Sequence, residues 1–143
     1  LGVCRGRGIK VGLSTWFRQD RNNTRLAVAD PRAHADLWIR TLDLLEREGV
    51  ADTVLYVDLC NEFPGEFWAP FFSQDAGVSS WNADTDRAFA WMTEALGAFR
   101  AAKPAYLSTV SFNGTAFGRV KEGAAFDLFD PHLWLVQLDD FYA

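Results

Sequence analysis

Two acidic side chains, Asp58 and Glu62, occur in an otherwise apolar stretch, and Asn61 immediately precedes the second of them. The stretch, residues 54–63, has the run of apolar residues expected of a buried strand. Because side chains alternate across a strand, an unbroken strand would place Asp58 and Glu62 on one face. Buried carboxylates are unfavourable unless they are paired or take part in chemistry, so general acid or base catalysis is one interpretation. The other is that Asn61 and Glu62 only end the strand and are solvated at its tip.

Strand-like and helix-like segments alternate along the chain. Apolar alternation and helical spacing predict strands at residues 9–17, 54–63, 105–112 and 126–135 and helices at 30–48 and 85–103. Such alternation implies parallel strands joined by right-handed crossovers, so the predicted fold class is α/β, built from parallel βα units. No glycine-rich phosphate loop follows these strands, which argues against a nucleotide-binding doubly wound fold. Because Pro131 lacks an N–H group, we expect strand pairing to stop near it or to begin after it.

The composition limits the class of partner. The formal net charge of -5 argues against nucleic acid and against an anionic membrane surface. Aromatic residues make up 15% of the chain, which suits sugar binding because pyranose faces stack on aromatic rings, although a large core would use the same rings. The stretch 64–84 includes Trp68 and Trp81 among polar residues, and it either walls a cleft or folds into a local hydrophobic plug.

Other residues with reactive side chains are interpreted as structural. Cys4 and Cys60 are the only cysteines, too few for a disulfide framework or a metal site, and Cys60 lies in a predicted buried strand. His34 lies in the first turns of a predicted helix, and no second metal-binding residue is suitably spaced, so we expect a solvated side chain rather than a ligand. Asp130 precedes a proline and is expected to be a turn residue.

Three short motifs resemble, in order, the clan-A glycoside hydrolases, which are retaining enzymes with a (β/α)8 TIM barrel. Residues 58–62 end a strand in Asn-Glu with an acid four positions earlier, as in strand four of that clan. Residues 12–17 resemble strand three of its cellulase-like branch, and residues 132–134, His-Leu-Trp, resemble the His and aromatic pair at the end of strand six. The resemblance implies that residues 1–143 form a single partial TIM-barrel domain, about half a barrel, corresponding to strands three to six.

The same resemblance implies a role for each candidate site residue. Glu62 would be the general acid/base, and Asn61 would hydrogen-bond the sugar 2-hydroxyl group. Asp58 is a supporting acid that either tunes and positions Glu62 or is structural. Without the resemblance His132 would be a core or loop residue, and with it His132 lies near the sugar. The residues expected to contact substrate, besides Asn61, are His132, Trp134, Trp16, Trp68 and Trp81. The implied substrate is a β-glycoside in an oligo- or polysaccharide, with no metal ion and no organic cofactor.

The chain lacks two features of that clan, the full length of the barrel and the nucleophilic glutamate. A complete barrel needs about 250 residues, and the clan's nucleophile is a second glutamate on strand seven. After Trp134 the only acidic residues are Asp139 and Asp140. We therefore expect a fragment of a larger cellulase-like hydrolase that carries the acid/base, lacks the nucleophile and is inactive alone.

The unpaired strand edges of such a fragment predict association, either with the missing barrel half or with a second copy. The sequence begins at Leu1 rather than Met, and no signal peptide or membrane-length apolar run is recognised in it. Two alternatives stay open. One is a non-catalytic carbohydrate-binding module or pseudoenzyme that keeps the aromatic cleft. The other is a complete small α/β protein of unrelated function.

Overall fold

The structure is a computed structural model that describes residues 1–15, 30–63, 85–112, 123 and 125–132. The helices are α1 (Gly2–Gly6), α3 (Pro31–Arg47), the short 3-10 helix η1 (Ala51–Thr53) and α6 (Thr85–Ala102). The strands are β1 (Val11–Ser14), β2 (Val54–Asp58), β3 (Leu107–Thr109), β4 (Ser111–Phe112) and β5 (Asp130–Pro131). Within these ranges, no helix is both long and apolar enough to cross a membrane.

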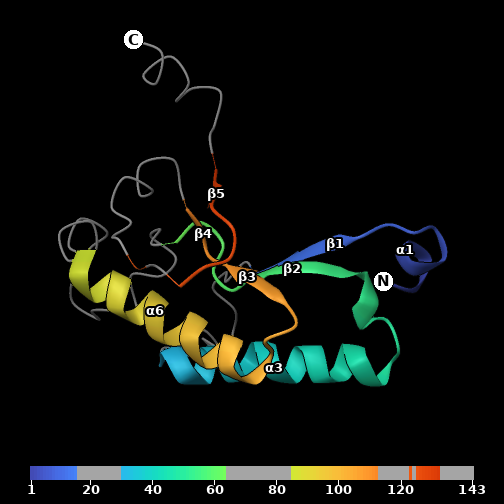
Figure 1. Ribbon diagram of the computed structural model, residues 1–143, viewed down its shortest axis with the longest axis horizontal. Coiled ribbons are helices and arrows are strands. Elements are labelled where there is room, and N and C mark those ends of the chain that lie inside the picture. Colours follow the sequence, from blue (N-terminus) through green and yellow to red (C-terminus); the bar gives the residue numbers. More distant parts are fainter. Residues whose placement is uncertain (16–29, 64–84, 113–122, 124, 133–143) are drawn as a thin grey trace, which may run out of the picture.

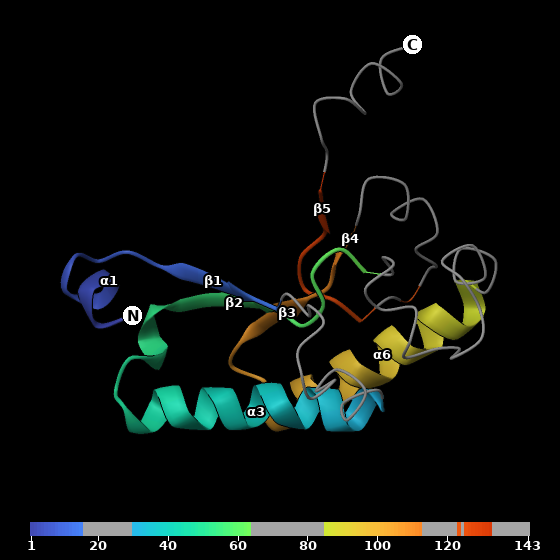
Figure 2. The ribbon, with the colours of Figure 1, turned by 180° about the vertical axis from the view of Figure 1, so that it is seen from behind.

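The strands lie side by side in the order in which they occur along the chain. β2 pairs in parallel with β1 on one side and with β3 on the other. β4 begins shortly after β3 and pairs in parallel with β5. The long helices α3 and α6 both lie on one side of these strands (Figures 1 and 2). The predicted α/β class with parallel βα units is confirmed, and consecutive strand order with helices on one side is how successive units of a β/α barrel are arranged.

Helix α3 begins at a strong start signal in the sequence. The Asp30 side chain accepts hydrogen bonds from the backbone N–H groups of Arg32 and Ala33, at 2.9 and 3.0 Å. Pro31 occupies the first turn, where its missing N–H group is not needed. Gly49, with a φ of 66°, follows the helix end, where a left-handed residue is common. The predicted helix over residues 30–48 is therefore correct to within one residue at each end.

The hydrophobic core lies between the sheet and the two long helices. Its buried members include Ala35, Trp38, Leu42, Val57, Leu59, Ala88, Met92, Ala95, Leu96, Phe99 and Val110. On the opposite face of the sheet, Gly12, Tyr56 and Leu107 are in register across β1, β2 and β3. A Cβ atom on Gly12 would lie 2.6 Å from the Tyr56 ring, so a residue larger than glycine would require that ring to shift. Because Gly12 and Leu107 are exposed, the described residues leave this face largely uncovered.

Two of the predicted strands are interrupted. The predicted strand 54–63 ends at Asp58, and the predicted strand 105–112 breaks at Val110. β1 covers the middle of the predicted strand 9–17. The local apolar pattern therefore locates each strand correctly and overestimates its length.

Within the described residues β5 ends at Pro131, so strand pairing stops there, as expected, with the proline itself as the last paired residue, opposite Phe112. The backbone N–H of His132, the next residue, donates to the carbonyl oxygen of Phe112 at 2.8 Å. Because alternate residues of a strand direct their backbone groups to opposite sides, the missing N–H of Pro131 faces away from β4. The proline therefore leaves this ladder intact.

Candidate active site

Glu62 lies just beyond the carboxyl end of β2, in a turn rather than in the strand. After Asp58 the chain leaves the extended conformation, and Asp58 Oδ1 accepts a hydrogen bond from the N–H of Cys60 at 3.2 Å. Glu62 then takes a left-handed backbone conformation, with a φ of 53°, which is uncommon for a residue other than glycine. The prediction that Asp58 and Glu62 share one strand face is therefore wrong, because the strand ends between them.

The Leu59 carbonyl group fixes the start of this turn. Its oxygen accepts hydrogen bonds from Thr15 Oγ1 at 3.0 Å, His34 Nε2 at 2.7 Å and Trp38 Nε1 at 3.1 Å. His34 Nε2 therefore carries a proton, and burial lowers the pKa of His34, so the ring is neutral at pH 7. The expectation of a solvated His34 is wrong, because this side chain is fully buried in the core. Burial likewise raises the pKa of the Cys60 thiol well above its ordinary value, in keeping with a structural role.

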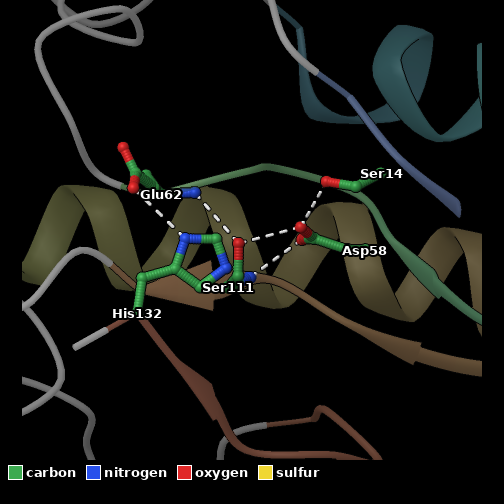
Figure 3. Close-up of polar contacts among 5 residues, drawn as sticks. All are labelled: Ser14, Asp58, Glu62, Ser111 and His132. Carbon is green, nitrogen blue, oxygen red and sulfur yellow. Dashed lines mark hydrogen bonds and ion pairs between the residues drawn. The ribbon is translucent and has the colours of Figure 1, made fainter. Parts of the chain in front are cut away.

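Asp58 is buried and lies at the centre of a hydrogen-bond network (Figure 3). Its Oδ2 atom accepts from the hydroxyl groups of Ser14, at 2.6 Å, and Ser111, at 2.8 Å. Its Oδ1 atom accepts from the backbone N–H groups of Ser111 and Cys60, at 2.8 and 3.2 Å. Burial raises the pKa of Asp58, and these hydrogen bonds oppose the shift because they favour the carboxylate. With two donors on each oxygen, the geometry suits an acceptor-only carboxylate.

Ser111, the first residue of β4, connects this network to Glu62. The backbone N–H of Glu62 donates to Ser111 Oγ at 3.0 Å, and that of Phe63 donates to the Ser111 carbonyl oxygen at 2.8 Å. The Phe63 ring is buried and stacks on Trp91 of α6, with ring centroids 5.6 Å apart. The backbone at Glu62 is therefore held by hydrogen bonds from β4, and the following residue is anchored in the core.

The side chain of Glu62 meets that of His132, which follows β5 (Figure 3). Nδ1 of His132 lies 3.2 Å from Oε1 of Glu62. The Glu62 side chain is 15% exposed and that of His132 is 32% exposed, so the pair is shielded on most sides and still reachable from solvent. The contact is a hydrogen bond when Nδ1 of a neutral imidazole carries the proton, and an ion pair when the imidazole is doubly protonated.

These side chains gather at one end of the parallel strands. Ser14 ends β1, Glu62 follows β2, Ser111 follows β3 and His132 follows β5. In α/β folds with parallel strands, the carboxyl ends of the strands are where catalytic side chains collect. A carboxyl group beside an imidazole is equipped for proton transfer. Across the described ranges, no group of three or more His, Cys, Asp and Glu side chains is arranged to hold a metal ion.

The structure brings some of the predicted site residues together. Glu62 contacts His132 directly, Asp58 reaches the Glu62 backbone through one serine, and Asn61 adjoins Glu62 in the same turn. The predicted tryptophan contacts lie outside the described residues, at Trp16, Trp68, Trp81 and Trp134.

Sequence reasoning missed Ser14 and Ser111. A usable signal was present, because both are small hydroxyl residues near the carboxyl ends of predicted strands. Only the structure shows that both hydroxyl groups reach the same carboxylate, that of Asp58, from neighbouring strands.

Comparisons with known proteins point to one family. The model of the cellulase-like family, described as sugar-binding cellulase-like, matches residues 1–143. Among solved structures, the chain is similar to a candidate glycoside hydrolase from Parabacteroides distasonis ATCC 8503, with a TM-score of 0.81 and 37% sequence identity. The similarity covers 95% of this chain and 36% of that protein, so the chain spans little more than a third of its length. No curated protein matches the chain. The predicted relationship to cellulase-like glycoside hydrolases is confirmed, and the chain belongs to the sugar-binding cellulase-like family.

Proposed function

We propose that this chain is the part of a retaining glycoside hydrolase that carries the general acid/base, and that Glu62 is that residue. The observation that carries the proposal is the contact between Glu62 and His132, in which a mostly buried carboxyl group meets an imidazole at 3.2 Å. Both side chains lie at the carboxyl ends of parallel strands. Membership of the cellulase-like family supports hydrolysis of an O-glycosidic bond as the reaction.

In this reaction Glu62 acts twice. Its protonated carboxyl group donates a proton to the departing glycosidic oxygen while a second carboxylate bonds to the anomeric carbon. The ionised Glu62 then takes a proton from the water that attacks the same carbon, which releases the sugar and the second carboxylate. Glu62 regains its proton, so the cycle is balanced. The imidazole of His132 would hold Oε1 of Glu62 in one orientation during both steps.

Substrate binding would involve the residues around this pair. Asn61 would hydrogen-bond the sugar 2-hydroxyl group, an interaction that strengthens as positive charge develops on the ring. Aromatic rings would stack on successive sugar units, and the candidates are Trp16, Trp68, Trp81 and Trp134. The substrate class is a β-glycoside of an oligo- or polysaccharide.

The nucleophilic carboxylate would come from another part of the complete protein. The two carboxyl groups of a retaining enzyme lie about 5 Å apart, and the similar solved structure is a longer chain, of which this one covers 36%. We propose that residues 1–143 are one partial barrel domain and that further βα units close the barrel and supply this carboxylate. Alone, the 143 residues would be inactive and would associate through unpaired strand edges, with the missing half or with a second copy.

The test is Glu62→Gln in the complete protein, with aryl β-glycosides of graded leaving-group ability as substrates. Glutamine keeps the shape of the side chain and cannot donate a carboxylic proton. We expect kcat/KM to fall by about 10²–10⁴-fold for poor leaving groups and far less for activated ones, which depart without protonation. Glu94→Gln on α6, where Glu94 forms an exposed ion pair with Arg32 at 2.8 Å, is the matched control. Equal activity of the two variants on the poor substrates would contradict the assignment.

A sugar-binding protein without turnover is the second candidate, because the family is described as sugar-binding. In that case the complete protein would bind an oligosaccharide saturably in calorimetry and release no reducing sugar. Trp68→Ala or Trp81→Ala would weaken this binding. Release of reducing sugar that Glu62→Gln abolishes would instead favour the enzyme.

A further inference from the structure

We infer that Ser111 is a positioning residue for Glu62, and that Asp58 acts on Glu62 through it. The inference rests on the proposed role of Glu62 and adds the residues that set its orientation. Ser111 does not touch the Glu62 carboxyl group. It holds the backbone from which that group projects (Figure 3).

The direction of each hydrogen bond follows from the chemistry of the groups. A serine hydroxyl group has one proton to donate and two lone pairs that can accept. An ionised carboxylate accepts only, so the proton of Ser111 Oγ points to Asp58 Oδ2, 2.8 Å away. The lone pairs of the same oxygen are then available to the N–H of Glu62, at 3.0 Å. Asp58 therefore fixes the orientation of the hydroxyl group that receives Glu62.

Asp58 is itself held in place by other segments. Ser14 of β1 donates to Oδ2 at 2.6 Å, and the N–H of Cys60 donates to Oδ1 at 3.2 Å. The backbone N–H of Ser111 also donates to Oδ1, at 2.8 Å, so Ser111 is bound to Asp58 at two points. The network thus ties β1, β2 and β4 together beside the turn that carries Glu62.

Glu62 needs such support because of its backbone conformation. A left-handed conformation at a residue with a Cβ atom is unfavourable and persists only where the surroundings impose it. Ser111 binds two successive backbone N–H groups at this point, that of Glu62 through Oγ and that of Phe63 through its carbonyl oxygen. Without Ser111 Oγ, the Glu62 N–H loses its acceptor and the peptide unit is free to rotate. The carboxyl group would then move relative to the glycosidic oxygen.

The structure offers a matched control on the same segment of chain. Ser108 is also buried, and its N–H and hydroxyl groups also bind one carboxylate, that of Asp127, at 2.9 and 3.1 Å. Ser108→Ala therefore also removes a hydroxyl–carboxylate hydrogen bond of a buried serine, although its partner Asp127 is more exposed than Asp58. The difference is that, among the described residues, the side chain of Ser108 is bonded to Asp127 and not to the turn of Glu62.

The experiment compares Ser111→Ala with Ser108→Ala in the complete protein, using an aryl β-glycoside with a poor leaving group and one with an activated leaving group. A displacement of about 1 Å at a reacting group lowers the rate by about 10²-fold. For Ser111→Ala we expect kcat on the poor substrate to fall about 10- to 100-fold, a much smaller loss on the activated substrate, and little change in KM. Ser111→Thr, which keeps the hydroxyl group, should recover most of the loss.

Three outcomes distinguish a failure of the positioning role of Ser111 from a failure of the proposed function. A loss of the same factor on both substrates, or a loss no larger than that of Ser108→Ala, overturns the inference. If Glu62→Gln in the same series has no effect on the poor substrate, the proposed function fails first. If Glu62→Gln is severely impaired and Ser111→Ala is not, only the positioning role fails.

A second pair of variants covers the case in which Ser111→Ala does not fold. Asp58→Asn keeps the shape of the side chain and replaces the accepting oxygen beside Ser111 by a donating amide, so the Ser111 hydroxyl must reorient. Asp127→Asn is the control at the second serine–carboxylate pair, where both Ser108 donors bind Oδ2 and the amide oxygen can still accept them, while the ion pair of Oδ1 with Arg100 is lost. A leaving-group-dependent loss for Asp58→Asn and not for Asp127→Asn supports the inference, and equal losses overturn it.

Discussion

Glycine is usually less favourable than alanine for stability. The left-handed backbone of Glu62 predicts the opposite at this position. Glu62→Ala and Glu62→Gly both remove the carboxyl group and its contact with His132, so their difference isolates the backbone. With a φ of 53°, a residue with a Cβ atom is disfavoured by about 1–2 kcal/mol, and glycine is not. Through the unfolded state, glycine at any position lowers stability relative to alanine by about 0.4–1 kcal/mol, because it makes the unfolded protein more flexible. The net expectation is that Glu62→Gly is about 0.5–1 kcal/mol more stable than Glu62→Ala.

The assay is urea unfolding of the complete protein, read as the shift of the midpoint at constant slope. Glu94, in the interior of α6, provides the internal standard, because its backbone is helical. There the glycine variant should be about 1 kcal/mol less stable than the alanine variant. The two pairs of variants should therefore differ in sign. Glycine that destabilises at both positions would refute the argument that the turn strains Glu62.

Two further predictions concern residues that support the sheet and this turn. Because burial lowers the pKa of His34 below its ordinary 6.5, the folded protein resists protonation there. The free energy of unfolding is therefore not reduced by His34 above pH 6.5. It falls as the pH drops from 6.5 toward the lowered pKa, by up to about 1.4 kcal/mol per pH unit. His34→Gln should remove this part of the slope in urea unfolding between pH 7 and 5, and an unchanged slope would contradict it. Gly12→Ala should destabilise by about 1–3 kcal/mol, because a Cβ atom would lie 2.6 Å from the Tyr56 ring. Gly97→Ala, in α6 with open space around it, should instead stabilise by about 1 kcal/mol in the same urea-unfolding assay, and equal effects of the two would count against the packing argument.

Taken together, the contacts describe a carboxyl group whose position is set from three directions. His132 contacts the side chain, Ser111 binds the backbone N–H, and the next residue, Phe63, packs against α6. In its proposed role as proton donor to a glycosidic oxygen, Glu62 would benefit from such restraint. The backbone strain at Glu62 accompanies this restraint. A relaxed backbone conformation would direct the Glu62 side chain away from His132.

Features that depend on residues close together in the chain could be predicted from the sequence. Helix α3 starts where Asp30 and Pro31 predict, since its capping hydrogen bonds span two and three residues. The order of strands and helices, and hence the α/β class, followed from apolar periodicity. The Asn61-Glu62 motif could also be recognised in the sequence, because a resemblance to a family depends on which residue types occur and in what order.

The backbone conformation and side-chain contact of Glu62 depend on residues that are far away in the sequence. The residue that holds its backbone, Ser111, is 49 positions away, and the imidazole at its side chain, His132, is 70 positions away. The end of β2 is set in the same way, because the Leu59 carbonyl oxygen collects donors from β1's end and from α3. Burial of His34 follows from that contact and not from its place in a helical pattern. These interactions join segments that are distant in sequence, so no local pattern of residues encodes them, and a strand that periodicity extends to Glu62 ends at Asp58 instead.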